Sequence, residues 1–357
     1  MFKKISLPLV GVLFAFGSLI LVACGNPGNM GLCVACFLRD TSGAIGLHSF
    51  AAAQYARPET IGILLGALIV SLITREFAPK GGSAPITRFV LGACVMIGAL
   101  IFLGCPTRMV LRIAGGDLNA VVGIFGFVAG IFGGMFFLNK GFSLRRTYKQ
   151  NKTEGFILPT LAVILLIALI FVPALLNFTE VGGGPGGARA PIWIALVVGL
   201  VMGGVGFISR FCFVGGIRDS FFFKNFSMLF AFLALLVVAT IGNLIMGNFN
   251  LSFEGQPVAH SDGLWNFLGL GLVGFASVLL GGCPFRQVVL AGSGNTDSVS
   301  AVFGMMFGAA IAHNFSIASS GAGVSENGPI AFIIAAVIVA AIAVFNTFFR
   351  KREGDKA

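Results

Sequence analysis

Long apolar runs recur along the whole chain and dominate its pattern. An α-helix needs about 20 consecutive apolar residues to cross the hydrocarbon core of a bilayer, and run after run approaches that length. The pattern predicts an all-α polytopic membrane protein. Ten membrane-spanning helices are expected, at about residues 5–23, 58–75, 86–103, 119–138, 156–176, 190–208, 226–247, 264–281, 298–315 and 329–349.

Shorter and more polar segments interrupt these runs near residues 28–52, 105–116, 210–224 and 283–296. They are too short or too polar to cross a bilayer by themselves. Polar backbone at membrane depth is tolerated only where it is buried in protein or lines a watery cavity. We therefore expect four re-entrant segments that enter the membrane and return.

Composition supports a lipid environment. Hydrophobic residues make up 57% of the 357 residues and charged residues only 10%, whereas soluble proteins carry about 25% charged residues. The net charge of +10 could suggest nucleic acid, but the Lys and Arg residues are spread over short connections and form no basic patch. The bilayer is the expected partner, and nucleic acid is not.

The basic connections indicate how the chain lies in the membrane. With Lys3 and Lys4 in the cytoplasm, alternation places residues 76–85, 139–155 and the tail 350–357 on the same side, and these are rich in Lys and Arg. The loops on the opposite side contain one Arg and no Lys. Positive residues favour the cytoplasmic side, so both termini are predicted to be cytoplasmic.

The polar segments occur twice in the same order. "GLCVACFLRD" at 31–40 matches "RFCFVGGIRD" at 210–219, and "GCPTR" at 104–108 matches "GCPFR" at 282–286. The aligned pairs are Cys33 with Cys212, Arg39 with Arg218, Asp40 with Asp219, Cys105 with Cys283 and Arg108 with Arg286, at offsets of 179 and 178. A nearly constant offset over several matched positions indicates an internal duplication.

Each copy contains five predicted spans, which is an odd number. The second copy must therefore enter the membrane upside down, as in the inverted repeats of many transporters. The predicted organisation is a first repeat at 1–177, a periplasmic linker at 178–189, a second repeat at 190–349 and a basic cytoplasmic tail at 350–357. The four polar segments should meet near the middle and give the molecule an hourglass shape.

The N-terminus has a second interpretation. Its basic start, apolar middle and small residues before Cys24 are also typical of a cleavable secretory signal. Residues 5–23, however, precede the first Cys-Arg-Asp segment as 190–208 precede the second. We therefore favour a retained first helix.

The repeated Cys-Pro pairs indicate the chemistry of the polar segments. Proline is favoured at the first position of a helix, so Cys105 and Cys283 should be N-caps. Free N–H groups and the helix dipole attract anions there, and Arg108 and Arg286 add positive charge at membrane depth. A thiol in such a place suits an anion that also carries a soft sulfur or selenium atom. With Cys33 and Cys212, these residues are the predicted substrate pathway.

The sequence leaves open the roles of the other residues in the repeated segments. Arg39, Asp40, Arg218 and Asp219 could hold the segments in place or act in gating. Cys36 has no thiol equivalent, because the offset of 179 lands on Gly215. Cys33 and Cys36 have a metal-ligand spacing, but a zinc site needs four ligands and the sequence offers no others at such a spacing. No catalytic triad or carboxylate pair stands out, so no metal, cofactor or catalytic site is predicted.

At these segments the chain resembles the YeeE/YedE family of bacterial inner-membrane sulfur-transport proteins, over nearly its whole length. "GNPGNMGLCVACFLRD" and "GCPTRMVLRIAGGD" are most similar to the YedE branch, which is described as transporting selenium. The resemblance implies an hourglass-shaped transporter that passes thiosulfate or a selenium species between cysteines at Cys33, Cys105, Cys212 and Cys283. It also implies a bacterial inner-membrane location and a cytoplasmic sulfur-carrier protein as a partner. The added Cys36 and the Cys-Pro-x-Arg motifs depart from the thiosulfate branch.

Two other functions fit the residues. A membrane thiol-disulfide oxidoreductase could use Cys33 and Cys36 as a redox pair. A simple small-anion channel would use the cysteines only as small pore-lining residues.

Overall fold

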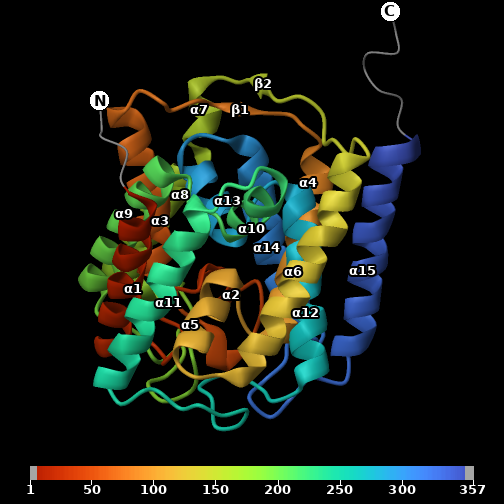
Figure 1. Ribbon diagram of the computed structural model, residues 1–357. Coiled ribbons are helices and arrows are strands. Elements are labelled where there is room, and N and C mark those ends of the chain that lie inside the picture. The colour runs from red at the N-terminus through yellow and green to blue at the C-terminus, as the bar shows by residue number, and fades with distance from the viewer. Residues whose placement is uncertain (1–5, 350–357) are drawn as a thin grey trace, which may run out of the picture.

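The computed structural model describes residues 6–349 and is mostly helical (Figure 1). Each of the ten predicted spans coincides with a helix. These are α1 (Leu7–Ala23), α3 (Pro58–Ile73), α4 (Pro85–Phe102), α6 (Leu118–Asn139), α8 (Ile157–Phe171), α9 (Ile192–Ser209), α11 (Ser227–Ile245), α12 (Gly263–Leu280), α14 (Thr296–Asn314) and α15 (Gly328–Val344).

Each predicted polar segment contains a short helix. These helices are α2 (Val34–Ala44), α5 (Pro106–Ala114), α10 (Phe213–Phe222) and α13 (Pro284–Gly292). The remaining elements are α7 (Lys152–Gly155), the 3-10 turns Ala51–Ala53 and Pro173–Leu175, the π-turn Phe345–Phe349 and the paired strands β1 (Lys80–Gly81) and β2 (Tyr148–Lys149).

Length and hydropathy identify membrane spans independently of the repeat. Within residues 6–349, seven helical stretches are long and apolar enough to cross a membrane. They are Ala51–Ile73, Pro85–Ala114, Leu118–Asn139, Ile192–Phe222, Ser227–Ile245, Gly263–Gly292 and Gly328–Phe349. Helices α1 and α8 are apolar but shorter. The protein is thus a multi-pass membrane protein by composition and helix length, while ten spans remain a prediction.

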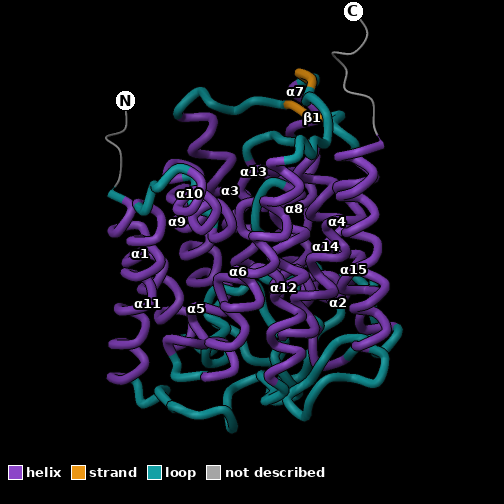
Figure 2. Tube along the Cα trace, turned by 45° about the vertical axis from the view of Figure 1, so that its right-hand side comes forward, coloured by secondary structure: helices purple, strands orange, loops and turns teal. Residues whose placement is uncertain are grey.

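The short helices lie inside a surround of long ones. Figure 1 shows α2 and α5 in the lower half of the molecule and α10 and α13 in the upper half. Helix α1 begins and α15 ends at the upper end, where β1, β2 and α7 also lie. In Figure 2 the loops gather at the two ends of the helices. Residues 1–5 and 350–357, which include Lys3, Lys4 and the predicted tail, lie outside the described part of the chain.

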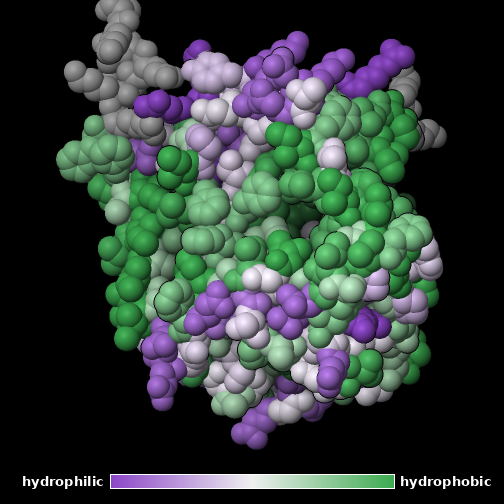
Figure 3. Space-filling view, turned by 180° about the vertical axis from the view of Figure 1, so that it is seen from behind, coloured by the Kyte–Doolittle hydropathy of each residue, from purple (hydrophilic) through white to green (hydrophobic). Residues whose placement is uncertain are grey.

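The outer surface is apolar between its two ends. Figure 3 shows a green hydrophobic zone between polar regions at the top and bottom. Large apolar side chains such as Ile164, Phe230, Ile245 and Ile333 are more than half exposed on the long helices. Such a zone is expected on a surface that faces lipid, since exposed apolar area of this extent is rare in soluble monomers.

The closest helix packing joins the two halves of the chain. Helix α3 packs against α9, α6 against α12, α4 against α14 and α1 against α11. Glycine allows this closeness: Gly62 and Gly66 of α3 face the backbone of α9, while Gly199 and Gly203 of α9 face the backbone of α3. Small residues spaced four apart are the usual means by which membrane helices approach each other closely.

Replacing Gly203 by alanine should therefore destabilise the protein. A Cβ atom at this position would lie 2.0 Å from the backbone oxygen of Ile63, so α9 would have to move. Overpacking of this kind costs about 1–3 kcal/mol. The measurement is thermal unfolding in detergent. Gly133→Ala on α6 is the control, because its Cβ would meet only the Phe275 ring at 3.9 Å. Equal melting temperatures for the two variants would contradict the prediction.

Candidate functional site

The first pair of short helices begins at two cysteines. Cys105 is the N-cap of α5 and is followed by Pro106, which confirms the N-cap prediction. Cys33 is the N-cap of α2, and its Sγ accepts the backbone N–H of Cys36 at 3.3 Å. Both thiols are fully buried. The structure thus adds a cap at Cys33, where no proline follows the cysteine.

The N-termini of α2 and α5 meet at these thiols. The Cys33 thiol lies beside the thiols of Cys105 and Cys36. The Cys105 Sγ lies close to the backbone N–H groups of Arg108 in α5 and Ala35 in α2. Two helix dipoles therefore point their positive ends at one cluster of sulfur atoms. Such convergence favours negative charge.

The second pair of short helices repeats this arrangement. Cys212 is the N-cap of α10 and accepts the backbone N–H of Gly215 at 3.4 Å, and Cys283 is the N-cap of α13 before a proline. The two thiols lie beside each other. The backbone N–H groups of Arg286 and Phe213 lie close to the Cys283 Sγ. The four duplicated cysteines thus form two pairs, one in each half of the molecule (Figure 1).

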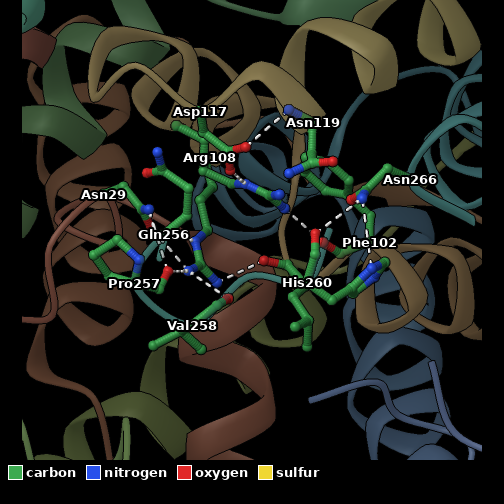
Figure 4. Close-up of polar contacts among 12 residues, drawn as sticks. Asn29, Phe102, Arg108, Asp117, Asn119, Gln256, Pro257, Val258, His260 and Asn266 are labelled. Atoms are coloured by element: carbon green, nitrogen blue, oxygen red, sulfur yellow. Dashed lines mark hydrogen bonds and ion pairs between the residues drawn. The ribbon is translucent and has the colours of Figure 1, made fainter. Parts of the chain in front are cut away.

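Arg108 is buried beside the first thiol pair, with neutral partners. Figure 4 shows its guanidinium facing the loop that carries Pro257 and Val258, whose carbonyl oxygens accept at 3.2 and 3.1 Å. Asn29 Oδ1 accepts at 2.9 Å, and Cys36 Sγ lies 3.6 Å away. Within residues 6–349 no carboxylate lies at ion-pair distance from Arg108. Its positive charge is therefore stabilised by neutral carbonyl, amide and thiol groups.

Arg286, the matched arginine of the second copy, is more open. It is partly exposed, and its buried Nη1 atom has no hydrogen-bond partner. It lines a cavity of 290 Å³ together with Arg210 and Cys212, and a neighbouring cavity of 340 Å³ together with Arg210 and Lys80. Near Arg108 there is a smaller cavity of 170 Å³, lined by Asn29 and other amide side chains. The two arginines therefore have similar positions in the sequence but different surroundings.

The two Arg-Asp pairs also differ. Asp40 accepts from Arg39 Nε at 2.7 Å and from Arg57 Nε at 2.8 Å, and all three side chains are buried. Among the described residues Arg218 pairs with Asp219 alone, and these side chains are 35% and 36% exposed. Asp40 thus joins α2 to the start of α3 in a buried ion-pair network, which is what a residue holding a segment in place would do. Asp219 lines the cavity at Cys212.

A family model described as sulphur transport matches residues 208–348. The match runs from just before α10 to the end of the last helix, and it includes Cys212, Cys283 and Arg286. No curated protein was found to match the chain. The match and the apolar helices together support a sulfur transporter of the membrane and agree with the resemblance to the YeeE/YedE family. The selenium branch stays a prediction.

Sequence reasoning missed three residues at this candidate site. Asn29 is a partner of Arg108, Arg57 a partner of Asp40, and Arg210 lines both cavities at Arg286. Arg57 could have been noticed as a charge at the start of an apolar run. The repeat comparison did not identify Arg210, because it selects positions that are alike in both copies and the offset of 179 pairs Arg210 with Gly31.

A second buried ion pair was missed near the first thiol pair. Arg112 donates to Asp117 at 2.6 Å and lies over the ring of Phe102, 4.1 Å from its centroid. It also donates to the Phe102 carbonyl oxygen at 2.7 Å, so it fixes the C-terminal end of α5 to the start of α6 and to the end of α4. Among residues 6–349, no three His, Cys, Asp or Glu side chains are grouped as a metal ion would require.

Proposed function

We propose that this protein is a permease for a small anion that contains sulfur or selenium, such as thiosulfate. The observation that carries the proposal is the pairing of thiols at converging helix N-termini, once at Cys33 and Cys105 and again at Cys212 and Cys283. Helix N-termini attract the charge of the anion. A thiol can make weak S–H···S contacts with its soft atom.

Contacts between the anion and these thiols would be weak, and weak contacts allow transport. An ion must bind well enough to enter and weakly enough to leave. Thiol hydrogen bonds are weak, and the N–H groups around each thiol pair are already partly engaged by sulfur. The anion would pass from one pair to the next, with Arg108 and Arg286 supplying positive charge. No bond in the anion is broken, so the protein is not proposed to be an enzyme, and no cofactor is needed.

An inverted repeat of five plus five helices is the proposed architecture. The helix packing supports it, because a two-fold exchange of the copies turns the pair α3 and α9 into α11 and α1, and the pair α6 and α12 into α14 and α4. All four pairs are among the closest in the molecule. The separate placement of α2 with α5 and of α10 with α13 supports re-entrant segments that enter from opposite sides, as in an hourglass.

The proposed orientation places the upper end of Figure 1 in the cytoplasm of a bacterial cell. That end carries the strands β1 and β2 and the basic loop 139–155, and positive residues favour the cytoplasmic side. The cavities at Arg210 and Arg286 would then open toward the cytoplasm. A cytoplasmic sulfur-carrier protein is the proposed recipient of the sulfur.

Uptake by reconstituted vesicles tests the function. Purified full-length protein should carry labelled thiosulfate into the vesicles faster than labelled sulfate, because sulfate has no soft terminal atom. Labelled selenite, measured beside them, distinguishes the selenium branch. Empty vesicles are the control. Equal rates for thiosulfate and sulfate would favour a simple anion channel, and no uptake of any anion would contradict the proposal.

A thiol-disulfide oxidoreductase is the second candidate, because the Cys33 and Cys36 thiols are in contact. Both cysteines are free in the structure. The redox function requires both thiols, so it predicts that Cys36→Ala is as damaging as Cys33→Ala. The permease predicts that Cys36→Ala retains uptake, since the second copy has Gly215 at this place.

A further inference from the structure

We infer that the cavity between Arg210, Arg286 and Cys212 is a binding site for a divalent oxyanion with a terminal sulfur or selenium atom, and that Arg210 determines its preference for doubly charged anions. This inference rests on the proposed function and deepens it. Arg210 has no counterpart in the first copy, so the site would exist only on the α10 and α13 side.

The charge of this cavity is the first reason. Of the charged groups lining it, Arg218 and Asp219 neutralise each other in an ion pair. Arg210 and Arg286 remain, and within residues 6–349 neither has a carboxylate at ion-pair distance. Their guanidinium groups are close enough to repel each other. A dianion between them would replace this repulsion by two attractions.

The backbone of Arg210 is the second reason. Arg210 ends α9 in the left-handed conformation, with φ of +55°. This position normally takes glycine or asparagine, since other residues are strained there. The conformation directs the chain from α9 into α10 and leaves the arginine at the boundary of both cavities.

The cysteine thiol that lines the cavity is the third reason. Cys212 lines it and is the least buried of the four duplicated cysteines, at 7% exposure compared with at most 1% for the others. The oxygen atoms of the anion would lie at the two guanidinium groups and its terminal sulfur at the Cys212 thiol. With a volume of 290 Å³, the cavity holds a tetrahedral anion together with several waters.

Equilibrium binding of labelled thiosulfate to the purified full-length protein in detergent tests the site. Arg210→Asn should raise the Kd for thiosulfate by at least about tenfold, which corresponds to one charge-assisted hydrogen bond. Asparagine suits the left-handed conformation, so loss of binding would not reflect unfolding. Arg210→Lys, which keeps the charge, should restore most of the affinity.

Arg75→Asn is the matched control. Arg75 also follows a helix end with φ of +59°, but it lines neither cavity. Its replacement should leave the Kd unchanged. In a second comparison, Cys212→Ala should bring the affinities for thiosulfate and sulfate together, because the soft contact is then gone.

The outcomes separate this site from the transport function. An unchanged Kd in Arg210→Asn, or no saturable binding of thiosulfate to the wild type, overturns the site even when vesicles take up thiosulfate. Binding that depends on Arg210 supports the site even when the vesicles take up none, and in that case only the transport proposal fails.

Discussion

Replacing Asp40 by asparagine is expected to lower the free energy of unfolding by about 3–5 kcal/mol, the usual loss when one partner of a buried ion pair is removed. Asp40 is fully buried, and its two oxygens accept from Arg39 and Arg57. An asparagine amide would turn a donor toward one of these guanidinium groups. Arg57 would then keep Glu59, at 3.8 Å, as a carboxylate partner, whereas Arg39 would have none among residues 6–349.

The second copy offers a matched control for this change. Asp219→Asn removes the equivalent carboxylate, but Asp219 is 36% exposed and pairs only with Arg218. Exposed ion pairs contribute about 0–1 kcal/mol. Unfolding by titration with sodium dodecyl sulfate in mixed micelles measures both variants. Similar losses for Asp40→Asn and Asp219→Asn would show that the buried network does not hold α2 in place.

Replacing Cys105 by alanine should reduce thiosulfate uptake at least about a hundredfold, or roughly 2.7 kcal/mol in the barrier. Its Sγ lies close to backbone N–H groups of both α2 and α5 and beside the Cys33 thiol. Alanine would remove one of the two thiols of the pair and leave these N–H groups facing a methyl group. Cys283→Ala should have the same effect, because Cys283 has the same place between α10 and α13.

Cys94→Ala controls for the loss of a buried thiol. Cys94 is 3% exposed and lies in the middle of α4, not at the start of a helix. Its replacement should leave uptake within about twofold of the wild type, since cysteine there behaves as a small hydrophobic residue. The measurement is initial uptake by vesicles with equal amounts of protein. Undiminished uptake in both Cys105→Ala and Cys283→Ala would exclude the relay of thiols.

The sequence was most informative where one local rule decides the structure. Helix positions follow from the length of apolar runs, so the ten predicted spans coincide with helices. The caps at Cys105 and Cys283 follow from the proline after each cysteine. The caps at Cys33 and Cys212 had no such signal. These two caps depend on the path of the backbone as it enters α2 and α10, and the preferences of the neighbouring residues do not determine that path.

Tertiary contacts determine the residue partners that the sequence did not predict. The second partner of Asp40 is Arg57, which caps the start of α3, and no spacing rule connects the two. Arg108 and Arg286 have the same motif, but the loop at Pro257 and Val258 covers only Arg108. A repeat comparison shows what two copies share. It is therefore unable to show features present in one copy, such as Arg210.

The unequal surroundings of Arg108 and Arg286 have an electrical consequence. In the proposed orientation, with α10 and α13 toward the cytoplasm, an anion entering the cell would move against the membrane potential, at about 2.3 kcal/mol per charge for 100 mV. The open guanidinium groups of Arg210 and Arg286 would then lie at the mouth where this opposing field must be overcome, whereas the charge of Arg108 is enclosed. A path with one strongly positive mouth carries ionic current unequally in its two directions, so the protein should behave as a rectifier for anions.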